Sequence, residues 1–477
     1  MFKLQGKALF NASTLLAATG FLLFGYDQGV MSGIVPNQHF LDLMGNPNSA
    51  VVGAMVALYE IGCMFGALNL AMTIAFRIVT GVGNGMNTAT VPVYQSEVSP
   101  PKSRGAHVCF ECALIVAGVG IAYWLEYGLH FVGGEVAWRF PLAFQIFFAL
   151  ILIAGTFFLP ETPRWLVAHD RDDDAKEVLA RLWSNGDVTH VRCVSEYEEI
   201  KQSIEAERRE GVSSYRVLFS KGKFNNRKRV LIAMLSQIIQ QLGGINVTTY
   251  YLTDVMIQAG MTYSMAMLMA GIDAIVYFIG ACLPIFIVER VGRRKIMLWG
   301  LAAQAVTLVW IGGAQKANTD NPSPSAANAA VAGTILYNFV FGCSWLGMSW
   351  LYPAEIFSTG LRAKGNSLST AANWIGNFIV AMIAPVLFEY ITFWTYILFA
   401  FMNLLFFPMV YFWFPETKGL SLEQVDILFA TEDVKNDIKS VDYDRYHNHN
   451  EEKADVEHTG QLDQKIEKAS PDDNHVQ

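Results

Sequence analysis

Charged side chains are scarce in this chain: they make up 16% of its 477 residues, whereas 53% of the residues are hydrophobic. A soluble protein of this size does not need so much apolar material, so the composition excludes that class and predicts an all-α, polytopic membrane protein. Apolar runs of roughly 18 to 25 residues have the length that crosses a ~30 Å hydrocarbon layer as a helix. The eleven expected spans are 12–34, 50–68, 70–95, 106–127, 139–160, 228–257, 265–288, 296–313, 329–354, 367–389 and 392–414.

Signs of enzyme chemistry are missing as well. The six cysteines form no zinc or disulfide framework, and Cys109-x-x-Cys112 on an apolar helix favours packing over redox chemistry. Gly81-x-Gly83-x-Gly85 lies in an apolar span, where small residues permit close helix approach rather than nucleotide binding. No metal, nucleophile or phosphate-loop constellation and no basic cluster for an anion occurs. We therefore expect no enzyme activity, no cofactor and no nucleic-acid partner.

One set of motifs occurs twice along the chain. Each copy consists of a Glu, an Arg seven residues later and, after a long apolar region, a Pro-Glu-Thr triplet 64 or 61 residues beyond the first Glu. Two halves built as parallel repeats of hydrophobic helices are typical of secondary transporters, whose substrate site lies near the bilayer midplane between the repeats. The copies are Glu97, Arg104 and 160–162, and Glu355, Arg362 and 415–417.

The positions of Lys and Arg predict the orientation. They concentrate in 101–104, 164–229, 289–295 and 362–364, and by the positive-inside rule these loops face the cytoplasm. Residues 431–477 carry 13 acidic and 6 basic residues, a balance of −7, with few apolar residues, so we expect them to be disordered.

Five segments follow from these signals, and the localisation we expect is the plasma membrane with both termini cytoplasmic. In the linker, one helix should begin at the acids Asp172–Asp174 and a second at the capping box Ser195-x-x-Glu198. The segments are the cytoplasmic N-terminus 1–11, the N-terminal transmembrane domain 12–160, the cytoplasmic helical linker 161–227, the C-terminal transmembrane domain 228–414, and the cytoplasmic acidic tail 415–477.

The first half is shorter than the repeat requires. In the second half a Gly-Arg-Arg loop near Glu289 lies 66 residues before Glu355, with two spans in between. Only 29 residues separate Leu68 from Glu97, so about 37 residues, enough for such a loop and one span, are unaccounted for. Topology agrees, because without a further span Lys102 and Arg104 would lie outside, against their positive charge. We infer a missing third helix with the join at 68–70, against the alternative that eleven spans are the normal form.

The motifs in their order resemble the sugar porter family of the major facilitator superfamily, especially its fungal branch. The resemblance covers about residues 15–430 and implies a major facilitator fold of two pseudo-symmetric helical domains, with twelve spans where this chain has eleven. The motifs are Gly25-Tyr26-Asp27-Gln28-Gly29-Val30, Arg77-x3-Gly81-x-Gly83-x-Gly85, Pro92-Val93-Tyr94-Gln95-Ser96-Glu97, Pro160-Glu161-Thr162-Pro163-Arg164-Trp165, Gln240-Gln241-x2-Gly244-x-Asn246-x3-Tyr250-Tyr251, Val291-Gly292-Arg293-Arg294 and Pro415-Glu416-Thr417-Lys418-Gly419.

Asp27 is a carboxyl group inside the first span, where an ionised acid costs roughly 2.5 to 3.5 kcal/mol. It should be protonated or paired, and Arg77 is its natural partner because each is the lone strong charge of its span. The hypothesis is that Asp27 binds the coupled proton and thereby loosens its pair with Arg77. The resemblance agrees, since proton-coupled sugar porters carry an acid here. The alternative is that Asp27 only caps a helix break.

Amides and aromatic rings in apolar spans form the candidate substrate site. Unsatisfied amides are costly in a membrane, and they bind neutral polyols through both donors and acceptors, while rings cover the apolar faces of a sugar. The resemblance implies that the matching residues line the sugar site; interhelical hydrogen bonding is the alternative. The candidate residues are Gln240, Gln241, Asn246, Tyr250, Trp350 and Trp374, and the resemblance adds Asn373.

Charged residues at the cytoplasmic helix ends resemble the gating network of the family, although solvated topogenic charge is the alternative. Single exposed ion pairs are weak, at about 0 to 1 kcal/mol, but a network that forms only when the inner mouth closes can bias an equilibrium between two states. The residues are Glu97, Arg104, Glu289, Arg293, Arg294, Glu355 and Arg362.

Two departures from the family pattern bear on the substrate. Glu111-Cys112 stands where relatives offer a Gln, and Leu346-Gly347 replaces the usual Gly-Pro. A hexose, a disaccharide or a smaller polyol therefore remains open, and Glu111 is either a second titrating group or a packing acid. The leading interpretation is a carbohydrate and proton symporter; the alternatives are a nutrient sensor on the same scaffold and an inactive shortened form.

Overall fold

The structure is a computed structural model that describes residues 5–44, 48, 51, 83–88, 90–91, 94, 98, 104–209, 215–220, 222, 224–358, 361–420 and 422–431. Every regular element in these residues is helical, as predicted. The first half contains α1 (Gly6–Ile34), α2 (Gln38–Leu43), α6 (Arg104–His130) and α7 (Val136–Thr156). The linker contains α8 (Pro163–Ala168), α9 (Asp172–Trp183), α10 (Val191–Arg209) and α11 (Tyr215–Leu218). The second half contains α12 (Asn226–Leu242), α13 (Ile245–Tyr250), α14 (Leu252–Gln258), α15 (Tyr263–Val291), α16 (Arg293–Asp320), α17 (Pro324–Phe341), the π-helix η2 (Gly342–Leu346), α18 (Gly347–Ile356), α19 (Arg362–Ile391), α20 (Trp394–Trp413) and α21 (Leu422–Phe429).

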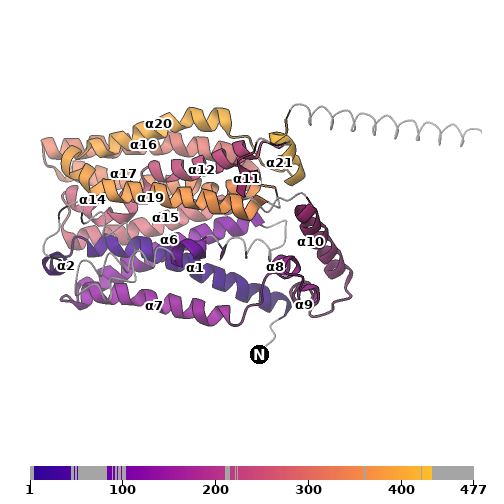
Figure 1. Ribbon diagram of the computed structural model, residues 1–477. Helices are drawn as coiled ribbons and strands as arrows, with labels where there is room; N and C mark the ends of the chain where they lie inside the picture. The colour runs from indigo at the N-terminus through magenta and orange to yellow at the C-terminus, as the bar shows by residue number, and fades with distance from the viewer. Residues whose placement is uncertain are drawn as a thin grey trace, which may run out of the picture.

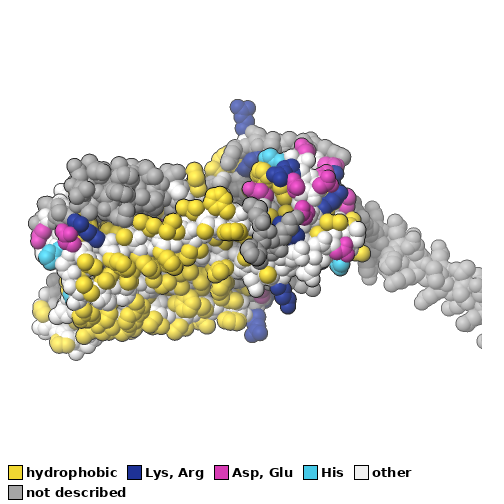
Figure 2. Space-filling view, turned by 90° about the horizontal axis from the view of Figure 1, so that it is seen from below, with side chains coloured by type: hydrophobic (Ala, Val, Ile, Leu, Met, Phe, Trp, Pro, Cys, Tyr) yellow, Lys and Arg dark blue, Asp and Glu magenta, His cyan; other side chains and the backbone are white. Residues whose placement is uncertain are grey.

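The long helices run side by side in one bundle (Figure 1). Within the described residues, nine helical segments are long and apolar enough to cross a membrane, and they match nine of the eleven predicted spans. The other two, 50–68 and 70–95, fall mostly outside the described residues. Hydrophobic side chains cover the flank of the bundle, whereas charged ones gather at its ends (Figure 2). This is the surface of a protein whose sides contact lipid.

The linker helices α8, α9 and α10 lie together at one end of the bundle, which we call the linker end; α2 lies at the opposite end, the α2 end (Figure 1). Leu9 of α1 joins the apolar core of these linker helices with Leu179 and Tyr197. Lys201 donates to the Asp172 carboxylate at 3.1 Å, and this hydrogen bond lowers the pKa of Asp172.

The helix predicted to begin at Asp172 does so, but the capping box at Ser195 is wrong. Ser195 lies inside α10, which begins four residues earlier at Val191. The His190 ring accepts from the backbone N–H of Arg192, and Cys193 is fully buried against α9. Packing of the first turn therefore extends the helix beyond the local capping signal.

Helices α1 and α6 cross at glycines. A Cβ atom on Gly25 would lie 1.7 Å from the carbonyl oxygen of Ile115, and one on Gly118 would lie 2.2 Å from that of Leu22. Any side chain at these two positions would collide with backbone. Asp27 is buried on α1 two residues after Gly25, next to this crossing.

The predicted span 228–257 is broken rather than continuous. Gly243 ends α12 and Gly244 adopts φ +104°, a conformation that favours glycine, before α13 begins. The freed carbonyl of Gly243 accepts from the Tyr337 hydroxyl and from the Asn403 amide, both at 2.9 Å. The break is stable in an apolar region because neighbouring helices satisfy the backbone group that it releases.

Candidate functional site

Buried amides from α12, α13 and α19 form one hydrogen-bonded cluster. Asn373 donates to the side-chain oxygens of Gln237 at 2.6 Å and Gln240 at 2.8 Å. Asn246, on the far side of the glycine break, donates to Gln241 at 2.7 Å. The structure thus brings Asn373 of α19 together with four amides of α12 and α13 that lie more than 120 residues before it in the sequence. We call Gln237, Gln240, Gln241, Asn246 and Asn373 the amide cluster.

Unsatisfied polar atoms remain beside this cluster. Asn373 Oδ1 and the indole Nε1 of Trp374 are buried and have no hydrogen-bond partner within the described residues. A buried polar atom without a partner costs roughly 1 to 3 kcal/mol, which a ligand hydroxyl would recover. One of these atoms is an acceptor and the other a donor, and a hydroxyl group is able to satisfy both kinds.

Aromatic rings surround the cluster. Trp374 contacts Phe24 of α1 edge-on, with 5.4 Å between ring centroids, and Trp350 packs against the same group of α1 and α6 side chains. Tyr250 is buried, and its hydroxyl accepts from Asn377 at 3.2 Å. The two tryptophans therefore lie between the amides of the second half and the helices of the first.

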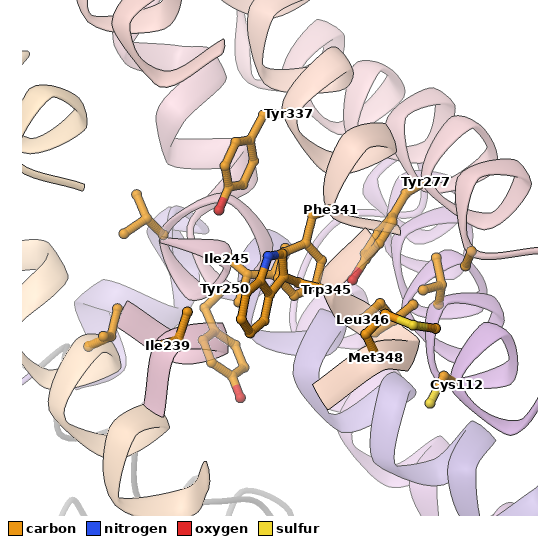
Figure 3. Close-up of a cluster of buried hydrophobic side chains, with 14 of the residues drawn as sticks. Cys112, Ile239, Ile245, Tyr250, Tyr277, Tyr337, Phe341, Trp345, Leu346 and Met348 are labelled. Atoms are coloured by element: carbon orange, nitrogen blue, oxygen red, sulfur yellow. The ribbon is translucent and has the colours of Figure 1, made fainter. Parts of the chain in front are cut away.

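An apolar core surrounds Trp345 (Figure 3). Trp345 lies among Ile245, Phe341 and Tyr250, and its indole donates to the carbonyl of Met297 at 3.0 Å. It belongs to the π-helix η2, which shifts the register between α17 and α18. Gln240 of the amide cluster donates to the backbone carbonyls of Trp345 and Leu346 at 3.5 Å, so this core adjoins the cluster.

The two departures from the family pattern, Glu111-Cys112 and Leu346-Gly347, lie where the halves meet. Cys112 is buried in the shared core, and a Cβ on Gly347 would lie 3.4 Å from Cys109 Sγ. Glu111 is also buried, at 2% exposure, and neither of its carboxyl oxygens has a hydrogen-bond partner in the described part of the chain. The first half therefore contributes a thiol and a carboxyl near this interface.

Asp27 is 1% exposed on α1 and lies beside the glycine crossing with α6. Its proposed partner Arg77 lies outside the described residues. The burial of Asp27 agrees with the expectation that it is protonated or paired, while the structure does not test the pair with Arg77.

At the linker end, Arg293 bridges two acids. Its guanidinium lies 2.7 Å from Glu289 and 2.6 Å from Glu355, and Glu355 also accepts from the Thr417 hydroxyl at 2.6 Å. Glu416 accepts from the backbone N–H of Arg293 at 2.9 Å, as a carboxylate does at a helix N-terminus. One network therefore ties together the ends of α15 and α18, the start of α16 and the segment after α20.

Arg294 joins this network through its backbone N–H, which donates to Glu416 at 3.2 Å, while its guanidinium donates to the carbonyl of Tyr411. Arg362 is the first residue of α19. Glu97 and the side chain of Arg104 fall outside the described part of the chain.

Sequence reasoning missed several polar residues of these sites. Gln237 and Asn377 lie one turn from predicted residues, and the signal that could have found them was the amide itself in an apolar span. In the sequence, Glu416 was only part of the Pro-Glu-Thr triplet that marks the repeat. In the structure its carboxylate accepts from the backbone N–H of Arg293 and caps the start of α16. Arg229 is 1% exposed, and its guanidinium donates to the Asp426 carboxylate of α21 and to the Ile356 carbonyl. These contacts hold α21 at the linker end.

A protein-family model described as "Sugar (and other) transporter" matches residues 68–429. The chain is 38% identical to the MFS-type transporter oryC of Aspergillus oryzae over 467 residues, covering 89% of this chain and 86% of that protein. It is 35% identical to the sugar transporter STL1 of Saccharomyces cerevisiae over 475 residues, covering 90% of this chain and 82% of that protein.

The fold is similar to that of the proton:xylose symporter XylE bound to 6-bromo-6-deoxy-D-glucose. The TM-score is 0.74 at 23% sequence identity, covering 89% of this chain and all of that one. The likeness confirms the predicted major facilitator fold.

In both alignments part of the relative has no counterpart inside this chain, and we call this difference the internal shortfall. The oryC alignment is 467 positions long, but 89% of 477 residues is about 425, so about 42 of its positions pair a residue of the relative with a gap here. For STL1, 475 positions against about 429 residues leave about 46. The family match moreover begins at residue 68, at the predicted join.

Proposed function

This chain belongs to the sugar porter family of the major facilitator superfamily, and we propose that it moves a neutral sugar or polyol across the membrane by alternating access, in symport with protons. The observation that carries the proposal is the amide cluster with its two unpaired neighbours, Asn373 Oδ1 and Trp374 Nε1. It is a buried set of donors and acceptors beside aromatic rings, at the junction of the two halves.

The cluster suits a neutral, hydroxyl-rich ligand. Its hydrogen-bonding groups are amides and an indole, and these pair with hydroxyl groups without introducing net charge. Trp350 and Trp374 supply flat apolar faces against C–H groups of a sugar ring. Glu111-Cys112 stands where relatives offer a Gln, so the amide partner is absent there and a ligand other than a hexose, such as a small polyol, is a competing candidate.

Proton coupling is assigned to Asp27 with Arg77. Asp27 is buried at the crossing of α1 and α6, where it bears directly on the packing of the first half. Protonation removes the cost of a buried charge and loosens the pair with Arg77, so it changes the relative stability of the conformations that alternate during transport. The protein of similar fold, XylE, is a proton:xylose symporter, and this supports the assignment.

The linker end is proposed to be cytoplasmic, and the Arg293 network to be its gate. Arg293 is 4% exposed and holds α15, α16 and α18 together, so the network contributes most when that end is closed. The linker and the acidic tail then lie in the cytoplasm, in keeping with the positive charge of the linker-end loops. We propose the plasma membrane as the location.

A second candidate function is that this 477-residue form is an inactive shortened form of such a transporter. The observation that favours it is the internal shortfall of about 42 to 46 aligned positions, against about 37 residues inferred from the repeat. The amide cluster is built only from the second half, so ligand binding could survive where transport does not.

Exchange assays test the proposal. Purified protein in liposomes preloaded with one unlabelled solute should take up the same solute in labelled form, and the panel should span hexoses, disaccharides and polyols. We expect counterflow for at least one neutral polyhydroxyl compound and none for sugar phosphates. Binding without counterflow would support the inactive shortened form, and the absence of both binding and counterflow in folded protein would refute the proposed substrate class.

A further inference from the structure

Two more carboxyl groups are buried where the halves meet, toward the α2 end. Glu126 of α6 is 3% exposed and Asp273 of α15 is 1% exposed. Glu126 Oε1 and Asp273 Oδ1 have no hydrogen-bond partner in the described residues. One acid belongs to each half. Neither is among the residues assigned to substrate, coupling or gating above.

The acids are enclosed by hydrogen bonds that cross between the halves. Tyr123 of α6 donates to the Thr249 carbonyl at 2.6 Å, and Tyr263 of α15 donates to the Gly33 carbonyl at 2.8 Å. Glu126 packs closely on Gly33: a Cβ atom added to Gly33 would lie 2.4 Å from Glu126 Oε2. The halves are therefore closed around Glu126 in this structure.

Asp273 is linked to the substrate site. Its Oδ2 accepts from Asn338 at 2.7 Å, and Asn338 accepts from the Thr248 hydroxyl at 2.8 Å. Thr248 lies on α13, two residues after Asn246 of the amide cluster. Tyr123 lies within electrostatic reach of both acids and packs in one core with residues on either side of Asp273.

No cation in the described residues balances these carboxyls. On the helices that build the interface, the basic residues are Lys7, Arg104 and Arg290, each toward the linker end. Arg104 is 22 residues from Glu126 and Arg290 is 17 from Asp273, about 25 to 33 Å along a helix. The titratable groups that face the acids are Tyr123, Tyr263 and Tyr277, while Asp254 and His130 lie close to Tyr263. On the adjoining helices Arg139 is paired with Glu135 and Lys316 with Asp320.

A metal ion fits the site poorly. No group of three potential metal-ligating side chains gathers anywhere in the part of the chain that the structure describes. Two ionised carboxylates buried without a counter-ion are strongly disfavoured in a membrane, whereas two protonated ones are not.

We propose that Glu126 and Asp273 form a second proton-binding site, distinct from Asp27, and that both must be protonated for the two halves to close at the α2 end. When the halves separate there, water reaches the carboxyls and they ionise; closure then requires that protons bind again. The site rests on the proposed transport function and adds a proton requirement to one half of its cycle.

Thiol accessibility tests this directly, without substrate. Ser32 is fully buried at the same interface, where it bonds Thr253 at 3.1 Å. The Ser32→Cys chain is treated with a membrane-impermeant methanethiosulfonate in nanodiscs from about pH 6 to about pH 9, and the adduct at position 32 is quantified by mass spectrometry. Because thiol reactivity itself rises with pH, each rate is divided by that of the same chain carrying Glu126→Gln and Asp273→Asn.

We expect the ratio of the two labelling rates to rise at least about tenfold from about pH 6 to about pH 9. Only the chain that retains Glu126 and Asp273 opens as these residues lose their protons. Glu135→Gln, which neutralises an exposed acid at the same end, should leave the rise unchanged. A ratio that stays constant with pH overturns the proposal. Loss of transport with a preserved rise would instead contradict the proposed function and leave this site standing.

A second measurement needs no variant. An apolar carbodiimide adds to protonated carboxyl groups, and peptides carrying Glu126 and Asp273 should gain its mass in amounts that fall as pH rises. Glu135, exposed at the same end, should gain little. Labelling of Glu135 without labelling of Glu126 and Asp273 at any pH would overturn the proposal.

Discussion

Asn373 is the residue on which the amide cluster depends most. Its side-chain N–H groups serve both Gln237 and Gln240, while its oxygen is unpaired. Asn373→Ala should weaken binding of the transported solute by about tenfold or more, because a lost ligand hydrogen bond and two unpaired amides together exceed ~1.4 kcal/mol. Binding isotherms in detergent measure this.

Asn318→Ala is the matched control for that variant. Asn318 bonds the Ala259 carbonyl near the end of α16, outside the amide cluster. It should lower the melting temperature without changing affinity. Equal affinity losses in both variants would show that the cluster is only structural hydrogen bonding between helices.

Asp27 carries the prediction on coupling. Asp27→Asn retains size and hydrogen bonding but cannot ionise, so exchange of solute should persist while accumulation against a gradient is lost. The measurement compares counterflow with pH-driven uptake in the same liposomes. If Asp27→Asn accumulates solute as the parent does, Asp27 serves only to cap a helix break.

At the residue scale, the sequence predicted residue types better than their partners. Gln240 and Gln241 stand out as amides in an apolar span, which requires no knowledge of the fold, whereas Asn373 was implied only by the family resemblance. The bridge from Arg293 to Glu355 joins residues 62 positions apart, and only the packing of α16 against α18 brings them together. Glu126 and Asp273 are acids inside apolar spans, as Asp27 is, and the sequence shows this. That they meet at the interface of the two halves is visible only in the tertiary structure.

Glycine packing is the testable feature of the helices in the first half. Gly25→Ala would put a methyl group 1.7 Å from the Ile115 carbonyl, so α1 and α6 must separate. We expect a loss of about 1 to 3 kcal/mol, the usual cost of overpacking, seen as a lower melting temperature in detergent.

Gly128→Ala is the control for this prediction. Gly128 also lies in α6, but a Cβ there meets nothing within 4 Å, and alanine favours helix over glycine by about 1 kcal/mol. The control should keep or raise the melting temperature. A tolerated Gly25→Ala would mean that the crossing of α1 and α6 is looser than the structure indicates.

At the element scale, span positions follow from apolar length, but breaks do not. The span 228–257 reads as continuous because its apolar residues run through Gly243 and Gly244. What permits the break is the pair of donors, Tyr337 and Asn403, from other helices. The π-helix at 342–346 likewise leaves no mark in hydropathy.

For the whole molecule, the shortfall predicts a longer counterpart. The transcript across the codons for 68–75 should contain, in at least one form, an in-frame segment of about 40 residues encoding a Gly-Arg-Arg loop and an apolar span. The longer protein should melt at a higher temperature, because its first half would pack a further helix. If the short junction is the only transcript and the protein is stable and active, eleven spans are the normal form.

Proton-driven accumulation tests the central claim most directly. Liposomes containing the protein and given an inward proton gradient of one pH unit should concentrate a labelled neutral sugar or polyol up to about tenfold for one coupled proton, and an uncoupler should abolish this. Asp27→Asn should reach only equal concentrations inside and outside. Uptake that never exceeds equilibration in the parent, or that ignores the gradient, would contradict symport.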